Sequence, residues 1–267
     1  MALLTRNYRG EMPFLDHLEE LRWRILWTLL AIFAGSVVGF ILVLRFEVLD
    51  LLINPFYEVM GEEQRLIFLT PTEPFFLLLR IGILSGIVLV LPIIVYQIWA
   101  FLSPALERHE KRVIIPSLYG GVLLFAGGVY LAYTQALTAA LRFLLFFGED
   151  YFDMMLQAGP YFSFVTKILI AFGVLFELPI VIVILSALGL VTPAFLRAKR
   201  RHAIVIITVL ASVLTPGDVV TVTAMMMVPM VVLYEISILL SWMIYRRRRE
   251  NEKKIGGDPP DGSVEAE

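Results

Sequence analysis

The sequence predicts an all-α polytopic membrane protein with six transmembrane helices, the last two of them short. Of the 267 residues, 59% are hydrophobic and only 17% are charged, and the mean hydropathy is +0.82. A soluble domain is about half apolar and about a quarter charged. The apolar residues are gathered in long blocks, and lysine and arginine are concentrated in alternate segments between these blocks, as in membrane proteins with several spans.

The first three apolar blocks are each long enough to cross a bilayer. They run from Trp23 to Leu44, from Phe75 to Phe101 and from Val113 to about Ala136. At about 1.5 Å per residue, each exceeds the roughly 30 Å of a hydrocarbon core. Residues 45–74 are polar and rich in turn residues, so we expect an external loop with a short helix near residues 48–52. The charged segment 103–112 is expected to form a loop on the opposite side.

The second half of the chain repeats this alternation with shorter elements. Residues 137–160 are amphipathic and then acidic, and we expect a second external loop there. The fourth block runs from Tyr161 to Leu190 and the sixth from Val219 to Tyr245. The fifth, Ala203 to Leu214, reaches only about 18 Å and is short for a span. Thr215-Pro-Gly-Asp218 is a turn signal between the last two blocks.

The basic residues predict the orientation of the chain. Seventeen of the 22 lysines and arginines lie in the N-terminal segment, the loops at 103–112 and 191–202, and the C-terminal tail. Cytoplasmic segments carry such an excess, so we expect both termini in the cytoplasm and a multi-pass protein of the plasma membrane. The five basic residues outside these segments are Arg45, Arg65, Arg80, Arg142 and Lys167.

The composition divides the chain into three parts. Residues 1–22 are expected to form a cytoplasmic amphipathic segment, and residues 23–245 a six-helix transmembrane domain. Residues 246–267 are polar and rich in glycine and proline near the end, which favours a disordered cytoplasmic tail.

Enzyme and cofactor signatures are absent from the sequence. It holds no Walker P-loop, no His-Glu-x-x-His and no Gly-x-Ser-x-Gly, so we predict no enzyme. Pro216-Gly-Asp218 does not make an intramembrane aspartyl protease, because no second aspartate lies within a span. There are no cysteines and only three scattered histidines, so we expect neither a metal nor a cofactor. The net charge of −2 gives no reason to expect a nucleic-acid partner.

Two pairs of acidic residues near the cytoplasmic surface are candidate binding groups. Glu19 and Glu20 precede the first span, and Glu107 and Glu110 lie in the first cytoplasmic loop. In one interpretation Glu20 pairs with Arg24 and Glu107 with Lys111, each four positions later in its own helix. In the other, they form a partly desolvated cluster that receives a cationic ligand. Arginine suits such a cluster, because its guanidinium makes two parallel bonds to a carboxylate.

Glu177 is the third candidate, because a carboxylate within a membrane span is functional by default. Lys167 lies ten residues earlier, about 15 Å away along a helix, and cannot pair with it there. Glu177 is either a neutral acid that hydrogen-bonds a neighbouring helix or the proton site of a secondary transporter for a small solute. A transporter predicts inverted repeats between the halves, and none is evident. Glu235 is a weaker candidate of the same kind.

Four motifs, in order, resemble the TatC family, the multispanning core of the twin-arginine protein translocase. The resemblance extends from about residue 13 to residue 245. The motifs are His17-Leu-Glu-Glu-Leu-Arg22, Tyr96-Gln-Ile-Trp-Ala-Phe-Leu-Ser-Pro-Ala-Leu106 followed by Glu107-Arg-His-Glu-Lys-Arg112, Phe172-Gly-Val-Leu-Phe-Glu-Leu-Pro179, and Leu214-Thr-Pro-Gly-Asp218.

The resemblance implies binding of twin-arginine signal peptides on folded cargo proteins. It also implies assembly of the export site with TatA and TatB, in a hetero-oligomer with several copies, driven by the proton motive force. By position, Glu20 and Glu110 match the family carboxylates that bind the arginine pair. Phe101 matches an aromatic residue beside them, and Glu19 and Arg22 belong to the same first motif.

The resemblance also assigns residues within the membrane and on its far side. Glu177 matches the intramembrane glutamate of the family, and Asp218, with Thr215, belongs to the last external turn. Pro55 matches a proline of the first external loop. The family often has glutamine four residues after the acid of that turn, and this chain has Val222 instead. The short fifth block is expected to thin the bilayer around it.

Overall fold

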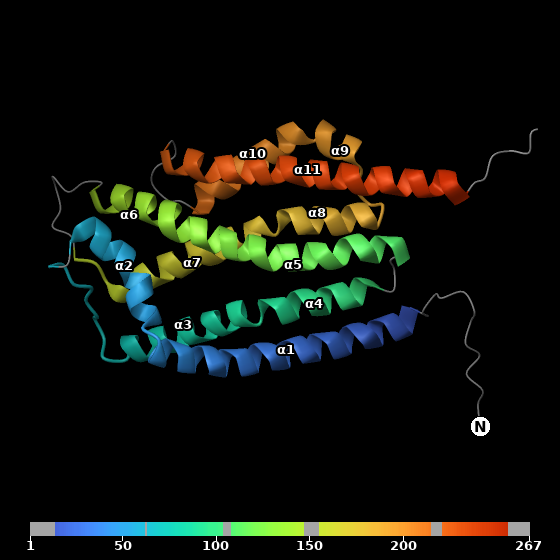
Figure 1. Ribbon diagram of the computed structural model, residues 1–267. Helices are drawn as coiled ribbons and strands as arrows, with labels where there is room; N and C mark the ends of the chain where they lie inside the picture. The colour runs from blue at the N-terminus through green and yellow to red at the C-terminus, as the bar shows by residue number, and fades with distance from the viewer. Residues whose placement is uncertain (1–13, 62, 104–107, 147–154, 215–220, 256–267) are drawn as a thin grey trace, which may run out of the picture.

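The computed structural model describes residues 14–61, 63–103, 108–146, 155–214 and 221–255 (Figure 1). These residues form a bundle of helices, and the one bridge between extended residues joins Ile67 to Gln157. The elements are α1 Phe14–Arg45, α2 Val48–Met60, α3 Glu73–Leu89, α4 Leu91–Leu102, α5 Arg108–Leu131, the π-helix η2 Ala132–Ala136, α6 Leu137–Phe146, α7 Ala158–Phe176, α8 Leu178–Ala187, α9 Pro193–Ala198, α10 Arg200–Leu214 and α11 Thr221–Ile255.

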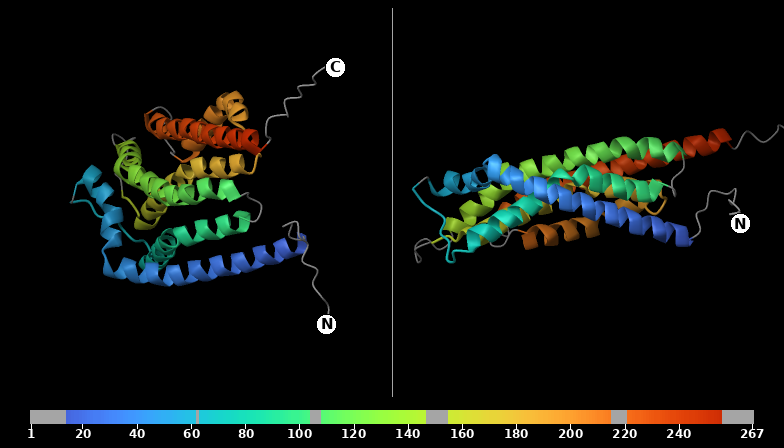
Figure 2. Two further views of the ribbon diagram at one scale, coloured as in Figure 1. Left: turned by 45° about the vertical axis from the view of Figure 1, so that its right-hand side comes forward. Right: turned by 90° about the horizontal axis from the view of Figure 1, so that it is seen from below.

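The chain passes along the bundle six times, in α1, α3–α4, α5–α6, α7–α8, α10 and α11 (Figure 1). Within the described residues, four segments are long and apolar enough to cross a membrane: Asp16–Arg45, Pro116–Phe146, Ala158–Ala187 and Met226–Arg246. The pair α3–α4 is a fifth, bent by 50°. Both views in Figure 2 place the start of α1 and the end of α11 at the same end of the bundle, which we call the α1 end. The opposite end, with α2, is the α2 end.

Proline breaks two of the passes. The second pass is interrupted at Val90, two residues before Pro92, and the fourth at Glu177, two residues before Pro179. Proline donates no backbone hydrogen bond, and its ring clashes with the preceding turn. Glu177 consequently lies at the junction of α7 and α8 rather than inside a continuous helix.

Three predicted boundaries differ from the structure. Residues 137–146, assigned to an external loop, continue the third pass as α6, because Leu137, Leu141 and Leu145 bury one face of this helix. The helix expected near residues 48–52 is the longer α2. Of the last two helices, both expected to be short, α10 is short, with 15 residues, but α11 has 35. The helix α11 also continues through residues 246–255, which were expected to belong to the C-terminal tail.

Glycines let α1 and α3 cross at close range. A Cβ built on Gly39 would overlap the carbonyl oxygen of Gly82, and one built on Gly86 would overlap the backbone at Gly35 and Ser36. Each helix carries its glycines four residues apart, so the two small faces meet along one turn. This crossing fixes how α1 lies against the second pass.

The buried core and the exposed apolar surface are both characteristic of a membrane protein. A main core joins α2 and α5–α7 through Phe56, Leu137, Val165 and Phe172, and a second cluster joins α8–α11 around Met230. Large apolar residues such as Phe33, Leu123 and Val213 are at least 70% exposed. Lipid, rather than water, is the solvent that accommodates such a surface.

Candidate functional site

The first turns of α1 lie against the last turns of α4 at the α1 end of the bundle (Figure 1). The imidazole of His17 stacks on the ring of Phe101, with centroids 4.3 Å apart and an interplanar angle of 11°. Two turns along α1, Arg24 Nη1 donates to Gln97 Oε1 at 3.4 Å. Because Glu20 is three residues after His17 and four before Arg24, all three side chains share one helix face. We call His17, Glu20, Arg24, Gln97 and Phe101 the α1–α4 site.

The carboxylate of Glu20 is only partly satisfied within this site. Arg24 donates to its Oε1 from Nε at 2.9 Å and also from Nη2. The other oxygen, Oε2, is buried and accepts no hydrogen bond within the described structure, and His17 Nδ1 is 3.7 Å from it. A buried carboxylate oxygen without a donor is costly, so Oε2 is prepared to accept a further charged hydrogen bond.

Two other residues of the predicted binding surface, Glu19 and Arg22, are not brought into this contact. Glu19 and Arg22 are exposed and lie on other faces of α1. Glu110 is in the first turn of α5, but its side chain lies outside the described part of the structure. Glu107, Thr215 and Asp218 are also outside the described residues. Of the predicted residues, the structure therefore brings Glu20 and Phe101 to the same site, joined through His17, which stacks on Phe101 and has Nδ1 3.7 Å from Glu20 Oε2.

Sequence reasoning missed two members of the α1–α4 site. His17 belongs to the first motif, but the motif alone gives it no role, and nothing in the sequence marks Gln97 as a candidate. The spacing of His17, Glu20 and Arg24 predicts one shared face, so the histidine was within reach of the sequence. Gln97 is 73 residues from Arg24, and only helix packing brings the two together.

Glu177 lies within the candidate span Ala158–Ala187 and against α5. A Cβ built on Gly121 would be 2.7 Å from Glu177 Oε2, so the carboxyl occupies the space that this glycine leaves open. Glu177 Oε1 is buried, with no hydrogen-bond partner in the described structure. Its carboxyl thus has hydrogen-bonding capacity for a group supplied from outside the chain.

Pro55 is buried inside α2 at the opposite end of the bundle. As it has no N–H, the carbonyl of Leu51 has no donor four residues later, and Tyr133 donates its hydroxyl there instead, at 2.9 Å. Tyr161 similarly donates to the Leu52 carbonyl at 2.8 Å. Two tyrosines therefore fasten α2 to the bundle around Pro55. Within the described residues, no group of three or more His, Asp or Glu side chains is placed to hold a metal ion.

A family model described as Sec-independent protein translocase protein (TatC) matches residues 16–229. This chain belongs to the TatC family. The TatC of Aquifex aeolicus is 39% identical over 246 residues, covering 91% of this chain and all of the relative. That of Carboxydothermus hydrogenoformans is 37% identical over 243 residues, covering 91% and 98%.

The fold agrees with this membership. A crystal structure of the twin-arginine translocase receptor TatC has a TM-score of 0.71 and 39% identity, covering 86% of this chain and 99% of the other. The same receptor in a second structure has a TM-score of 0.73 and 40% identity, covering 84% and 99%. The predicted all-α fold with six transmembrane passes is therefore confirmed. The chain is a multi-pass membrane component of protein transport and not an enzyme. Membership of this family excludes the alternative interpretation, a secondary transporter for a small solute.

Proposed function

We propose that this chain binds twin-arginine signal peptides of folded cargo proteins at the α1–α4 site. The observation that carries the proposal is the carboxylate of Glu20, which is paired with Arg24 through one oxygen and has a buried, unsatisfied second oxygen. A guanidinium is the cation whose planar fork matches a carboxylate at short range. The likeness to a crystal structure of the twin-arginine translocase receptor supports the same ligand.

Arg24 indicates how an arginine ligand would be held. It lies along Glu20 and reaches Gln97, so it is itself a guanidinium bound at this site. In this proposal, the guanidinium of a signal-peptide arginine donates to Glu20 Oε2, next to the His17–Phe101 stack. An aromatic face attracts a guanidinium by cation–π interaction, worth about 0.5–2 kcal/mol according to solvent exposure. Glu110, at the start of α5, is the proposed carboxylate for the second arginine of the pair.

The proposed orientation puts the α1–α4 site at the cytoplasmic surface of the plasma membrane. The start of α1 and the end of α11 share one end of the bundle, and basic residues such as Arg22 and Arg246 are found there. Cytoplasmic ends of spans carry this excess of positive charge. A signal peptide would meet the site before insertion, and its apolar part would then lie along the spans.

The proposed partners are TatA and TatB, with several copies of the complex forming the export site. Glu177 offers a carboxyl that can donate and accept a hydrogen bond to a partner's transmembrane helix or to the inserted signal. Asp218 and Thr215 are proposed to contribute to docking at the far membrane surface, and Pro55 to hold α2 there. The sequence has no nucleotide-binding motif, so we propose that the proton motive force supplies the energy.

A crosslinking scan tests the proposal. A photoreactive group is placed beside the arginine pair of a signal peptide and irradiated with the full chain in membranes. We expect crosslinks to the start of α1 and the end of α4, and their loss when the peptide carries two lysines. Crosslinks confined to the α2 end, or the same crosslinks with two lysines, would show that the α1–α4 site is not the receptor for the arginine pair.

A further inference from the structure

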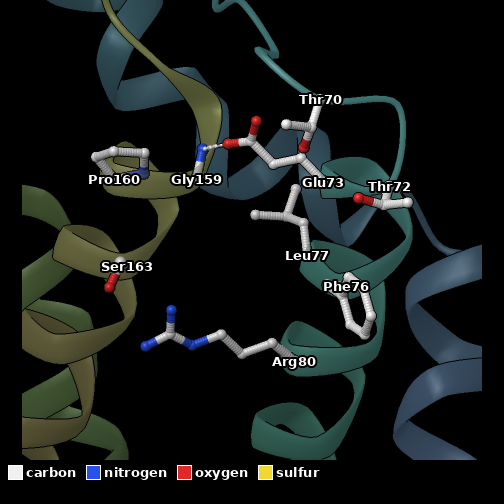
Figure 3. Close-up of a pocket in the computed structure, with 9 residues that line it drawn as sticks. All are labelled: Thr70, Thr72, Glu73, Phe76, Leu77, Arg80, Gly159, Pro160 and Ser163. Carbon is white, nitrogen blue, oxygen red and sulfur yellow. Dashed lines mark hydrogen bonds between the residues drawn. The ribbon is translucent and has the colours of Figure 1, made fainter.

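A polar cavity lies between α3 and α7, toward the α2 end of the bundle and away from the α1–α4 site at the α1 end (Figure 3). It has a volume of about 440 Å³. Its lining includes Thr70, Glu73, Phe76, Arg80, Gly159 and Ser163. Nothing in the proposed signal-peptide site uses these residues.

The cation of this cavity has no partner in the described structure. The guanidinium of Arg80 extends from α3 toward α7 and Ser163, and no described side chain accepts a hydrogen bond from it (Figure 3). Arg80 is seven residues into α3, and Ser163 is five residues into α7. At about 1.5 Å per residue, both lie roughly 8–11 Å from the helix starts. A cation at that depth in a span requires an anionic partner or water.

The single acid that lines the cavity is already engaged elsewhere. Glu73 Oε1 accepts from the backbone N–H of Gly159 at 3.1 Å, and its Oε2 accepts from that of Leu69 at 3.0 Å. A Cβ at position 159 would overlap Glu73 Oε1, so glycine allows this close approach. Glu73 thereby fastens the loop before α3 to the start of α7. Its carboxylate points away from Arg80 and leaves the guanidinium available (Figure 3).

We propose that this cavity binds the phosphate of a phospholipid headgroup from the leaflet at the α2 end. Arg80 supplies the forked, charged donor that suits a phosphate, and the hydroxyls of Thr70 and Ser163 supply neutral donors. Lys167, exposed one turn after Ser163 on α7, adds positive charge along the same helix face. Phe76, one turn before Arg80 on α3, is 61% exposed and offers an apolar surface to the acyl chains.

The lipid is favoured over a protein carboxylate because of where the cavity opens. It lies between two membrane-spanning passes, about 8–11 Å from the starts of α3 and α7, and phospholipids surround every membrane protein near the ends of its spans. A bound headgroup would join α3 to α7 across the cavity, on the same two helices that Glu73 and Gly159 join. The site is thus expected to stabilise the α2 end of the bundle.

Lipid titration of the full chain tests this assignment. The protein is purified in detergent, depleted of lipid, and titrated with phosphatidylglycerol while bound lipid is counted by native mass spectrometry. Arg80→Gln should weaken the tightest lipid adduct by about tenfold or more, the effect of losing a charged hydrogen bond. Arg80→Lys should retain part of the affinity, and Ser163→Ala should lose only a few-fold. Arg142→Gln, which removes an exposed arginine of α6 outside the cavity, is the matched control and should bind as the parent does.

Two further ligands distinguish the sources of the anion. Oleate carries a carboxylate on an acyl chain, and inorganic phosphate carries no chain at all. We expect both to bind less tightly than phosphatidylglycerol, and the thermal stability gained with the phospholipid to disappear in Arg80→Gln. Equal binding of phosphatidylglycerol to Arg80→Gln and the parent would overturn the site. Equal binding of oleate would assign it to a carboxylate, and equal binding of inorganic phosphate would assign it to a free anion, so either result overturns the lipid headgroup.

Discussion

The imidazole of His17 lies flat on the ring of Phe101, with the ring centroids 4.3 Å apart. This stack holds the first turns of α1 on the last turns of α4 and sets Glu20 beside an aromatic surface. It joins two segments that are 84 positions apart in the sequence, so the site exists only after the first two passes have packed.

Phe101→Ala is expected to weaken binding of a twin-arginine peptide. An aromatic pair contributes about 0.5–1.5 kcal/mol beyond its burial, so its loss should lower affinity roughly two- to tenfold. Phe101→Tyr keeps the ring and serves as the control, with affinity close to that of the parent. Peptide titration against the three proteins measures the effect, and unchanged affinity in Phe101→Ala would mean that the stack does not support the site.

Glu177 is expected to act through hydrogen bonding rather than by titrating. Glutamine keeps a donor and an acceptor, so Glu177→Gln should retain substantial export, whereas Glu177→Ala should impair partner docking. Both variants should bind the twin-arginine peptide nearly as the parent does, because the α1–α4 site is unchanged. Export assays at equal expression compare them. If the glutamine variant fails as badly as the alanine variant, the hydrogen-bonding role is wrong and a titrating role is favoured.

The glycine crossing of α1 and α3 is expected to be intolerant of a single methyl group. Gly39→Ala would put a Cβ into the backbone of α3, so the helices must separate and their packing must be lost. Such overpacking costs about 1–3 kcal/mol. Gly127→Ala is the matched control, because a Cβ there meets nothing within 4 Å. Thermal unfolding in detergent should show a lower midpoint for Gly39→Ala alone, and equal midpoints would refute the close crossing.

The short α10 is expected to thin the bilayer on its side of the protein. Its 15 residues reach about 22 Å, less than the roughly 30 Å of a hydrocarbon core. Arg200, at its start, pairs with Glu235 at 2.6 Å, and Glu235 is nine residues into the candidate span Met226–Arg246. Water or headgroups must therefore reach this depth.

Cysteines introduced singly along α10 measure this thinning with a water-soluble maleimide. We expect labelling at Ala203 and at Ser212, near the two ends of the helix, and protection only between them. Protection at both ends, extending several residues before Ala203, would show a span of ordinary depth and contradict local thinning.

The sequence predicted the passes well because their apolar blocks are long, and it predicted the Glu20–Arg24 pair because four residues make one helix turn. It did not predict α6, because Thr138 and Arg142 interrupt the apolar residues and the acidic segment that follows is typical of a loop. Only the structure shows that Leu137, Leu141 and Leu145 form a buried face. The contacts of Glu177 with Gly121 and of Arg24 with Gln97 depend on how whole helices pack, and no local pattern encodes them.

Recognition of the signal-peptide arginine by the Glu20 carboxylate is measured by a double-mutant cycle between protein and peptide. Peptides with Arg-Arg or Lys-Lys are titrated against the parent, Glu20→Gln, Glu110→Ala and the control Glu19→Gln. A charged hydrogen bond contributes about 1.5–3 kcal/mol, so Glu20→Gln should bind Arg-Arg roughly tenfold or more weakly. Glu110→Ala should show a similar loss, and Glu19→Gln should resemble the parent. We expect Glu20→Gln also to lose most of the preference for Arg-Arg over Lys-Lys. If Glu20→Gln and the parent discriminate between the two peptides equally, Glu20 does not read the arginine pair.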